Sequence, residues 1–296
     1  DSDGIVMDSS NDLAHIQIMG SGHTENTSNT GVIINKNNDG NEVAQIDDVK
    51  IGKTNNGDGY IIDIKMKNGA KAYISNSTLN SYFYDGGGDN DFNDATYNIY
   101  ATRNNVLTVT DSTLNAIANN VDGNAMNIWA NNGTELLADK NNLSASGEDY
   151  AINIAVGPGS SAEITSNVMS TYTDGTIGRS FNIDSYNYDS LTIEGNTMTG
   201  TSENYEAAGV YLQGEDAGDA DINNNSFTLT GDKGATGVIN VARGDGTTSV
   251  TNNTFNLTAT EEAFGIVDYF GNTSYSGNTY NLNADWAENI YPVPSS

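Results

Sequence analysis

Apart from its carboxylates, this 296-residue sequence has few side chains that could act as nucleophiles, acids or bases. It has no cysteine, which excludes thiolate catalysis, disulfides and thiolate metal sites. The only two histidines, His15 and His23, have no nucleophile partner visible in the sequence. Carboxylate pairs for glycoside cleavage are abundant by composition alone, so Asp184 near Glu215 or Asp216 is not a specific pair. We therefore expect no catalytic residue and no cofactor.

One acidic segment has the spacing of oxygen ligands for a hard cation. Residues 81–95 are expected to protrude as a loop, and aspartates recur in it between Asp85 and Asp94. An EF-hand would need glycine in place of Asp94 and glutamate in place of Tyr100, and a calcium roll would need tandem copies. We predict a solvated loop without a metal site, and Ca²⁺ binding is the alternative.

The charge of the chain is strongly negative. It has 39 acidic and 11 basic side chains, which give a formal net charge of -28. A general nucleic-acid-binding protein needs a basic surface, so that class is excluded. Hydrophobic residues make up 36% of the sequence, without an apolar run of membrane-spanning length, which predicts a folded chain. Five lysines are close in sequence and could form a basic patch for an anionic glycan or another copy, or could simply be solvated: Lys50, Lys53, Lys65, Lys67 and Lys71.

A repeat runs along almost the whole chain. Each copy has two alternating apolar positions, a short polar turn, and a further apolar residue that serves as the anchor of the repeat. The intervals between anchors range from 25 residues (255 to 280) to 35 residues (79 to 114). The anchors are Ile18, Ile51, Leu79, Leu114, Leu143, Met169, Met198, Phe227, Phe255 and Tyr280.

Each repeat is expected to hold about three short strands, because apolar residues alternate with polar ones before and after each anchor. No helical segment separates the strands, which excludes βαβ units, and the hairpin turns of a propeller are missing. The remaining architecture is a right-handed parallel β-helix of about ten coils. We predict one domain over residues 1–296, with residues 283–296 as an end cap or a cut point.

The residue two positions before each anchor is polar in every clear copy. Six successive copies have asparagine there, and the two before them have serine. Equivalent turns stacked in register would place these amides above one another in a hydrogen-bonded ladder, and asparagine also tolerates the left-handed backbone conformation of turns. The predicted ladder consists of Ser77, Ser112, Asn141, Asn167, Asn196, Asn225, Asn253 and Asn278.

A second alternating run, such as Tyr97-Asn98-Ile99, follows each anchor and is expected to expose its middle residue. The predicted outward column is Asp63, Asn98, Asn127, Asn153, Asn182, Tyr211, Asn240 and Asp268, and two residues later comes a column of Lys65, Tyr100, Trp129, Ala155, Asp184, Gln213, Ala242 and Phe270. Amides and carboxylates suit sugar hydroxyls, and aromatic rings stack on sugar rings, whereas an ordinary solvated face is the alternative. The candidate ligand-binding residues are Lys65, Asn98, Tyr100, Arg103, Asn127, Trp129, Asn153, Asn182, Asp184, Tyr211, Gln213 and Asn240.

The turns Asn225-Ser-Phe227 and Asn253-Thr-Phe255, with the bias toward Thr, Ser, Gly and Asn, resemble the passenger domains of AIDA-type autotransporter adhesins. The resemblance is architectural and covers all ten predicted coils. Pectin-lyase-like enzymes and phage tailspikes share the same fold. The resemblance implies a bacterial cell-surface or extracellular protein, exported through a C-terminal outer-membrane barrel that this sequence does not show. It also implies roles in aggregation, biofilm growth and attachment to host glycans or matrix proteins.

These features together predict a non-catalytic surface adhesin. Its expected partners are a host glycan or extracellular-matrix protein and another copy of itself, with no nucleic acid and no metal. Many weak contacts along a stiff solenoid suit attachment better than turnover. The main alternative is a polysaccharide lyase or hydrolase on the same fold, including the tailspike type, and a third hypothesis is an inert stalk.

Overall fold

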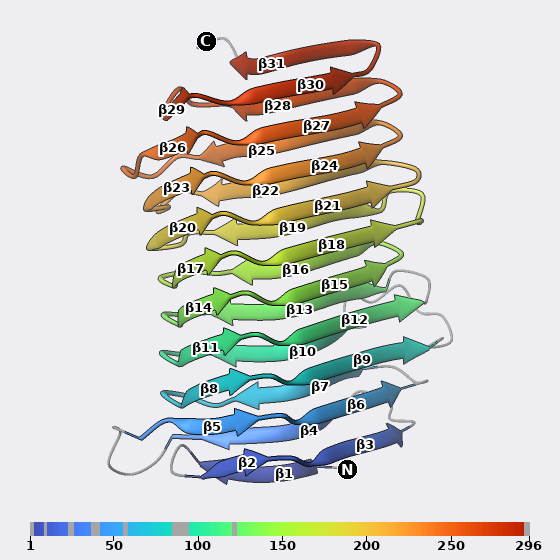
Figure 1. The fold of residues 1–296 in the computed structure, drawn as a ribbon, viewed down its shortest axis with the longest axis vertical. Coiled ribbons are helices and arrows are strands. Elements are labelled where there is room, and N and C mark those ends of the chain that lie inside the picture. The colour runs from blue at the N-terminus through green and yellow to red at the C-terminus, as the bar shows by residue number, and fades with distance from the viewer. Residues whose placement is uncertain are drawn as a thin grey trace.

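The computed structural model describes residues 3–8, 11–22, 27–36, 42–55, 59–84, 95–119 and 123–292. All its regular elements are β-strands, thirty-one in number, and they form three parallel sheets. In Figure 1 the near strands run to the right, the far strands return to the left, and the chain rises toward its C-terminus. This is a right-handed parallel β-helix with three strands per coil, as predicted. Within these residues, no helix long and apolar enough to cross a membrane occurs.

The strands are distributed to the sheets in strict rotation, so that every third strand belongs to the same sheet. Sheet A contains β1 (Asp3–Asp8), β4 (Thr27–Asn35), β7 (Gly59–Met66), β10 (Ala95–Thr102), β13 (Asn124–Asn131), β16 (Tyr150–Val156), β19 (Arg179–Tyr186), β22 (Glu206–Gly214), β25 (Gly234–Ala242), β28 (Glu262–Asp268) and β31 (Trp286–Pro292). Sheet B contains β2 (Asp12–Ala14), β5 (Ala44–Asp47), β8 (Lys71–Ser75), β11 (Val106–Thr110), β14 (Glu135–Asp139), β17 (Ser161–Thr165), β20 (Ser190–Glu194), β23 (Asp219–Asn223), β26 (Thr248–Thr251) and β29 (Thr273–Ser276). Sheet C contains β3 (Gln17–Gly22), β6 (Lys50–Asn55), β9 (Thr78–Tyr84), β12 (Thr113–Asn119), β15 (Asn142–Gly147), β18 (Val168–Thr173), β21 (Thr197–Ser202), β24 (Ser226–Gly231), β27 (Thr254–Ala259) and β30 (Thr279–Asn283).

Equivalent positions of successive coils lie directly above one another. The ten predicted anchors form one unbroken column in sheet C, from Ile18 paired with Ile51 at one end to Phe255 paired with Tyr280 at the other. All the anchors between them, from Ile51 to Phe255, are fully buried in the main hydrophobic core. The repeat therefore predicted both the register and the core side of sheet C.

The predicted ladder between sheets B and C is confirmed. Asn167 is typical of it: its side-chain oxygen accepts hydrogen bonds from the backbone N–H of Asn141 at 2.9 Å and from the side-chain amide of Asn141 at 3.0 Å. The Asn167 amide in turn donates to the Ala138 carbonyl at 2.8 Å and to Asn196 Oδ1 at 3.1 Å. The same pattern continues through Asn253 to Asn278. Each rung thus satisfies buried polar groups of the coil before it.

The backbone conformation of the ladder turns differs from the prediction in one respect. The left-handed residue is the one before each ladder residue, as at Asn224 (φ 56°) before Asn225 and at Ser166 (φ 57°) before Asn167. The ladder asparagines are needed for their amides, whereas the preceding positions need residues that tolerate a positive φ. Asparagine fills that preceding position at Asn76, Asn224 and Asn252, and glycine fills it at Gly195 and Gly277.

The predicted outward column on sheet A is wrong for its asparagines. Asn98, Asn127, Asn153 and Asn182 are completely buried, and so is Asp63 below them. The four asparagines form a second ladder, in which the amide of Asn98 donates to Asn127, that of Asn127 to Asn153 at 2.7 Å, and that of Asn153 to Asn182 at 3.0 Å.

The error in that column arises because the strands of sheet A break the period of two. Asn98 and Ile99 are both buried in succession, and Tyr97 and Tyr100, three residues apart, come to share the outer side. Strand pairing also skips this position, since Tyr97 pairs with Met126 and Ile99 with Ile128 while no pair joins Asn98 to Asn127.

The same interior column changes character in the C-terminal coils. The positions level with Asn182 are Gly209, Gly237 and Gly265, because their flanking residues pair in register. A side chain at these glycines would collide with the rings of Phe227, Phe255 and Tyr280, respectively. Those rings stack at 4.9 and 5.2 Å between centroids, both with an interplanar angle of 13°. A stack of rings therefore replaces the asparagine ladder in the space between sheets A and C.

This replacement corrects three more residues of the predicted outward column. Tyr211 is level with Asp184 and not with Asn182. Asn240 is fully buried, and its amide donates to Thr248, Asn272 and Thr273 at 2.9 to 3.1 Å. Asp268 is only 5% exposed, and its carboxylate accepts backbone N–H groups of the turn that follows, including that of Gly271 at 2.9 Å.

The predicted basic patch does not form a single surface. Lys50 and Lys53 belong to sheet C, Lys65 to sheet A and Lys71 to sheet B, so their side chains cannot share one face. Lys53 is only 5% exposed, because it occupies an inward position level with Ser81. Burial lowers the pKa of Lys53, and the nearby Asp63 carboxylate opposes that shift.

Two predicted segments at the surface have different outcomes. The loop over residues 81–95 is described only at its edges, where β9 ends at Tyr84 and β10 begins at Ala95; residues 85–94 lie outside the described part. Within the predicted end cap, β31 (Trp286–Pro292) continues sheet A by pairing with β28. Residues 286–292 are thus a regular strand of the solenoid.

The ladder between sheets B and C predicts a position-specific loss of stability. Replacing the buried Asn141 with alanine leaves the Ser112 N–H and the Val109 carbonyl without their partner. We expect Asn141→Ala to lower the free energy of unfolding by about 2 to 4 kcal/mol in urea titration. The neighbouring Asn142 is exposed on sheet C, so Asn142→Ala should change it by less than about 0.5 kcal/mol. Equal losses in the two variants would contradict the ladder.

The ring stack predicts a coupled pair. Gly237→Ala should destabilise the fold by about 1 to 3 kcal/mol, because the new methyl group meets the Phe255 ring and the backbone carbonyl of Gly265. Combining it with Phe255→Leu should restore part of that loss, so the double variant should be more stable than the sum of the single effects predicts. Strictly additive free energies of unfolding would show that the glycine is not there to admit the ring.

Candidate binding groove on sheet A

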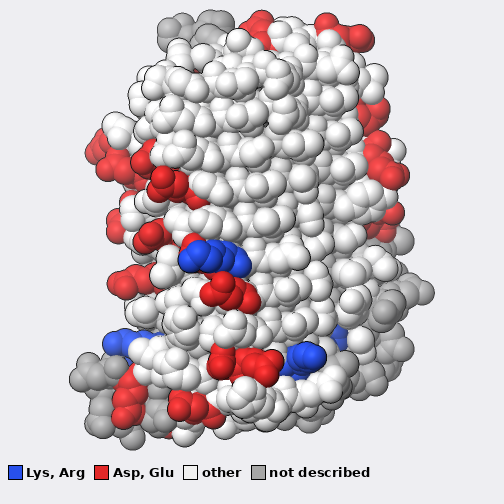
Figure 2. Space-filling model, in the orientation of Figure 1, with Lys and Arg blue, Asp and Glu red and all other residues white. Residues whose placement is uncertain are grey.

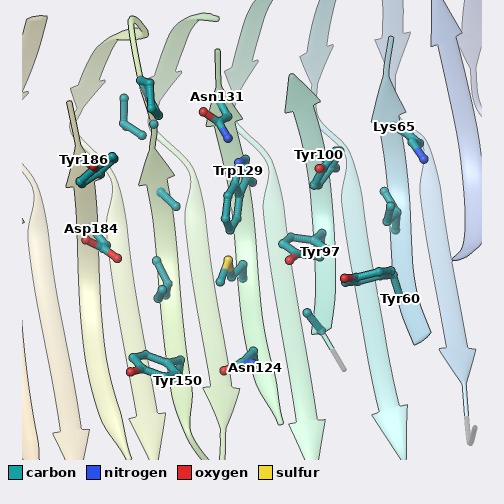
Figure 3. Close-up of a pocket in the computed structure, with 18 residues that line it drawn as sticks. Tyr60, Lys65, Tyr97, Tyr100, Asn124, Trp129, Asn131, Tyr150, Asp184 and Tyr186 are labelled. Carbon is teal, nitrogen blue, oxygen red and sulfur yellow. The ribbon is translucent and has the colours of Figure 1, made fainter. Parts of the chain in front are cut away.

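The outer face of sheet A is hollowed into a groove of about 890 Å³ across β7, β10, β13, β16 and β19. We name it the Trp129 groove. Figure 3 shows side chains from five neighbouring strands turned toward the same space. The labelled lining residues are Tyr60, Lys65, Tyr97, Tyr100, Asn124, Trp129, Asn131, Tyr150, Asp184 and Tyr186.

The hollow exists because one outward column of sheet A has a small residue, Ala155, between larger ones. This column runs from Tyr100 to Trp129, then to Ala155 and Asp184. Ala155 leaves a gap beside the indole of Trp129, and the glycine and proline that follow β16, Gly157 and Pro158, line the same gap. Strand spacing fixes the width of such a gap at about 4.8 Å for each coil.

Aromatic rings form one wall of the groove. Tyr97 makes edge-to-face contacts with Tyr100 at 5.3 Å and with Trp129 at 5.9 Å between centroids. Tyr100 and Trp129 are nearly parallel at 27° and 6.3 Å apart, and the ammonium of Lys65 lies 6.0 Å from the centre of the Tyr100 ring. Both Tyr97 and Tyr100 reach this wall because of the break in alternation at Asn98 and Ile99.

The polar groups of the groove are few, and several have perturbed protonation. Burial raises the pKa of Asp184 to about 6, although Gln213 donates a hydrogen bond to its carboxylate at 3.0 Å. Burial also raises the pKa of Tyr97, so its hydroxyl stays protonated at neutral pH. Within the described residues, Asn124 Oδ1 and Trp129 Nε1 are buried without a hydrogen-bond partner. Such unmet groups beside a hollow are typical of sites that contact water or a ligand.

The structure separates the twelve candidate residues into three groups. Lys65, Tyr100, Trp129 and Asp184 line the groove. Three others lie outside it. Gln213 donates a hydrogen bond to Asp184, and the Tyr211 ring stacks on that of Phe181 at 5.5 Å between centroids. Arg103 is exposed in the turn after β10. The asparagines are buried in the interior, so the exposure predicted for them is wrong: Asn98, Asn127, Asn153, Asn182 and Asn240.

Several residues that build the groove are not among the candidates that the sequence predicts. Tyr60, Tyr97, Tyr150 and Tyr186 line the groove, and Tyr97 is one of the apolar residues expected to flank Asn98 on the buried side. One signal was available in the sequence: tyrosine recurs in the segments that form six strands of sheet A, at Tyr60, Tyr97, Tyr100, Tyr150, Tyr186, Tyr211 and Tyr291.

Within the part of the chain that the structure describes, no three His, Asp or Glu side chains gather in a way that could hold a metal ion. His15 is exposed and its Nδ1 lies 2.8 Å from the Asp48 carboxylate. His23 and the acidic stretch 85–94 lie outside the described residues.

The raised pKa of Asp184 predicts a pH-dependent stability. The ordinary value is 3.8, so an unfolded chain ionises this carboxyl before the folded chain does, and stability falls as the pH rises from about 4 to about 6. Asp184→Asn removes that effect. Between pH 4 and pH 7, the free energy of unfolding of the Asp184→Asn variant, measured by urea titration, should rise by about 1 to 2 kcal/mol relative to that of the wild type. The exposed Asp221→Asn corrects for the loss of one negative charge, and an equal change in both variants would contradict the assignment.

Comparison with known proteins adds no neighbour to this picture. No protein-family model, no curated protein and no solved structure matches the chain. The function proposed below therefore depends on the geometry and chemistry of the Trp129 groove.

Proposed function

We propose that this protein is a non-catalytic adhesion module of a bacterial surface protein and that it binds uncharged glycan chains in the Trp129 groove. The observation that supports the proposal is the wall formed by Tyr97, Tyr100 and Trp129. These rings gather on the outside of the solenoid, around an open hollow, although rings of the same size elsewhere fill the core.

The groove has the composition that a sugar chain requires. Aromatic rings offer flat apolar faces on which a sugar ring can stack, and tyrosine hydroxyls and amides can bind the hydroxyl groups around its edge. Asn124, Asn131 and the hydroxyls of Tyr60 and Tyr150 surround the apolar wall. A largely apolar hollow with a few converging polar groups is the usual form of a small-molecule site.

Charge favours neutral over anionic glycans. Within the groove, Lys65 and Asp184 offer one group of each sign, so the lining has little net charge. The chain as a whole has a formal charge of -28. Figure 2 shows acidic side chains toward both edges of the visible face, with a broad uncharged area over the sheet C strands between them. Sulfated or uronic-acid chains would approach against this field.

Rigidity suits the groove to attachment. Every strand that lines the groove, from β7 to β19, is hydrogen-bonded to the coils above and below, so the rings are held in place before a ligand arrives. A preformed site loses little conformational entropy on binding. Several copies of such a stiff module on one cell would add weak contacts through avidity, which supports adhesion to glycans of host cells or matrix proteins.

A glycan array followed by calorimetry with the best neutral oligosaccharide tests the proposal. Trp129→Ala and Tyr100→Ala should each weaken binding by about five- to twentyfold, because a stacked ring contributes roughly 1 to 2 kcal/mol. The matched control is Tyr275→Ala, which removes an exposed ring from sheet B. It should leave the affinity unchanged.

Two results would overturn the proposal. One is an array without any neutral glycan hit, or hits whose affinity is unaffected by Trp129→Ala. The other is catalysis: new reducing ends or unsaturated ends after incubation with neutral or uronic-acid polymers, with and without Ca²⁺, would identify a hydrolase or lyase on the same fold. Sedimentation at several protein concentrations shows separately whether copies associate.

A further inference from the structure

Sheet A has a second hollow nearer the C-terminus, with a different chemistry. It has a volume of about 480 Å³ and is lined by residues of β22, β25, β28 and β31. Gly234 lies in the groove between Glu206 and Glu262 of the neighbouring coils, and Thr236 lies beside Phe264. We name it the Trp286 groove. Like the Trp129 groove, it forms where small outer side chains are flanked by large ones.

Three rings form a right-angled corner in this groove. Phe264 and Tyr291 are stacked at 25° with centroids 5.1 Å apart. Trp286 stands perpendicular to both, at 90° and 5.1 Å from Phe264 and at 89° and 5.2 Å from Tyr291. The indole is 42% exposed, so one side of the corner is open to solvent. A group seated there would meet ring faces from two directions.

Carboxylates stand beside the rings in the same column of sheet A. Glu206, Gly234, Glu262 and Trp286 occupy successive coils at equivalent positions. A Cβ at Gly234 would lie 3.7 Å from Glu206 Cγ, in ordinary contact, so the glycine leaves the space between the two glutamates open. The column therefore presents two acidic groups with a notch between them, next to an exposed indole.

These two carboxylates are not neutralised by an ion pair. Among the described residues, neither Glu206 nor Glu262 forms a salt bridge. Lys233, at the edge of the groove, forms a salt bridge with Glu261 instead. Burial raises the pKa of Glu206; the charge of Arg179 opposes that shift, and the charge of Glu262 adds to it. The negative potential in the groove is thus only partly balanced by the protein itself.

We propose that the Trp286 groove binds an alkylammonium group, with the cation between the ring corner and the carboxylates of Glu206 and Glu262. Aromatic faces attract cations through the ring quadrupole, and ammonium groups that carry alkyl carbons gain apolar contact as well. The carboxylates supply the complementary charge. A bare metal ion fits poorly, because hard cations need six or more oxygen ligands and three of the walls here are rings.

The proposal does not depend on glycan binding in the Trp129 groove. The Trp129 groove contains one basic residue, Lys65, and one acidic residue, Asp184. The Trp286 groove has an excess of carboxylates and would exclude an anion. The ammonium group could belong to a choline-type headgroup or to an amino sugar, since both have a cation attached to carbon. The two sources differ in size and in the number of N–H donors, which an experiment can separate.

The chain offers a clean reporter, because its two tryptophans are divided between the two grooves. In Trp129→Phe, all indole fluorescence comes from Trp286. We expect choline to change this emission saturably at constant ionic strength, and its uncharged isostere 3,3-dimethylbutan-1-ol to have at least tenfold weaker effect. Glucosamine and the neutral N-acetylglucosamine form the second arm, and a response to only one of the two cations identifies the source of the group.

Variants then test the assignment within the Trp129→Phe background. Glu206→Gln and Glu262→Gln should each weaken the cation response about three- to thirtyfold, while Asp221→Asn, an exposed carboxylate on sheet B, should leave it unchanged. An equal response to choline and its isostere, or full affinity in both glutamine variants, would overturn the proposal. In Trp286→Phe, the only remaining indole is that of Trp129, which reports on glycan binding. A failure of cation binding can therefore be told apart from a failure of glycan binding.

Discussion

Vertical register between coils is the constraint on which the whole structure depends. A parallel β-helix places the same position of every coil in one column, so each column must be chemically uniform or must change in a coordinated way. The asparagines from Asn141 to Asn278 enforce that register, because each amide bonds to the coil before it and the coil after it. A slip by one residue would leave a whole series of buried donors and acceptors without partners.

The interior of sheet A shows how a column changes in a coordinated way. Asn98 to Asn182 bond to one another in the middle coils, and Gly209, Gly237 and Gly265 take over where rings from sheet C fill the same space. Both solutions leave two successive buried residues in each strand. The outer side of sheet A then gains side chains at an irregular spacing, and the tyrosines at positions 97 and 100 meet there. The proposed binding surface is thus a consequence of how the core is packed.

Columns also explain why the grooves lie where they do. The sheet is hollow where one coil contributes a small residue between coils with larger side chains: Ala155 lies between Trp129 and Asp184, and Gly234 lies between Glu206 and Glu262. The chemistry of each hollow follows from the residues above and below it. Balanced charge near Trp129 and excess carboxylate near Trp286 distinguish the two proposed sites, which follow one another along sheet A: the Trp129 groove extends to β19 and the Trp286 groove begins at β22.

Much of this architecture could be predicted from the sequence, because anchors such as Leu114 and turns such as Asn196-Thr-Met198 repeat with nearly constant spacing. The orientation of the sheet A strands could not. A run such as Tyr97-Asn98-Ile99 alternates perfectly over three residues, and the break in period becomes visible only when Ile99 and Tyr100 are placed in space. Alignment by apolar pattern also matched Tyr211 with Asn182, since nothing in one sequence shows that Gly209 is the equivalent residue. The groove, which needs side chains from five strands, was therefore predicted only in part.

The most direct test of this account is the crystal structure of the protein with the best neutral oligosaccharide from an array. We predict electron density for a sugar ring stacked on Trp129 and Tyr100, on the outer side of sheet A. Ordered sugar on sheet B or sheet C instead, with the Trp129 groove filled only by solvent, would contradict the central claim that the break in alternation creates the binding face.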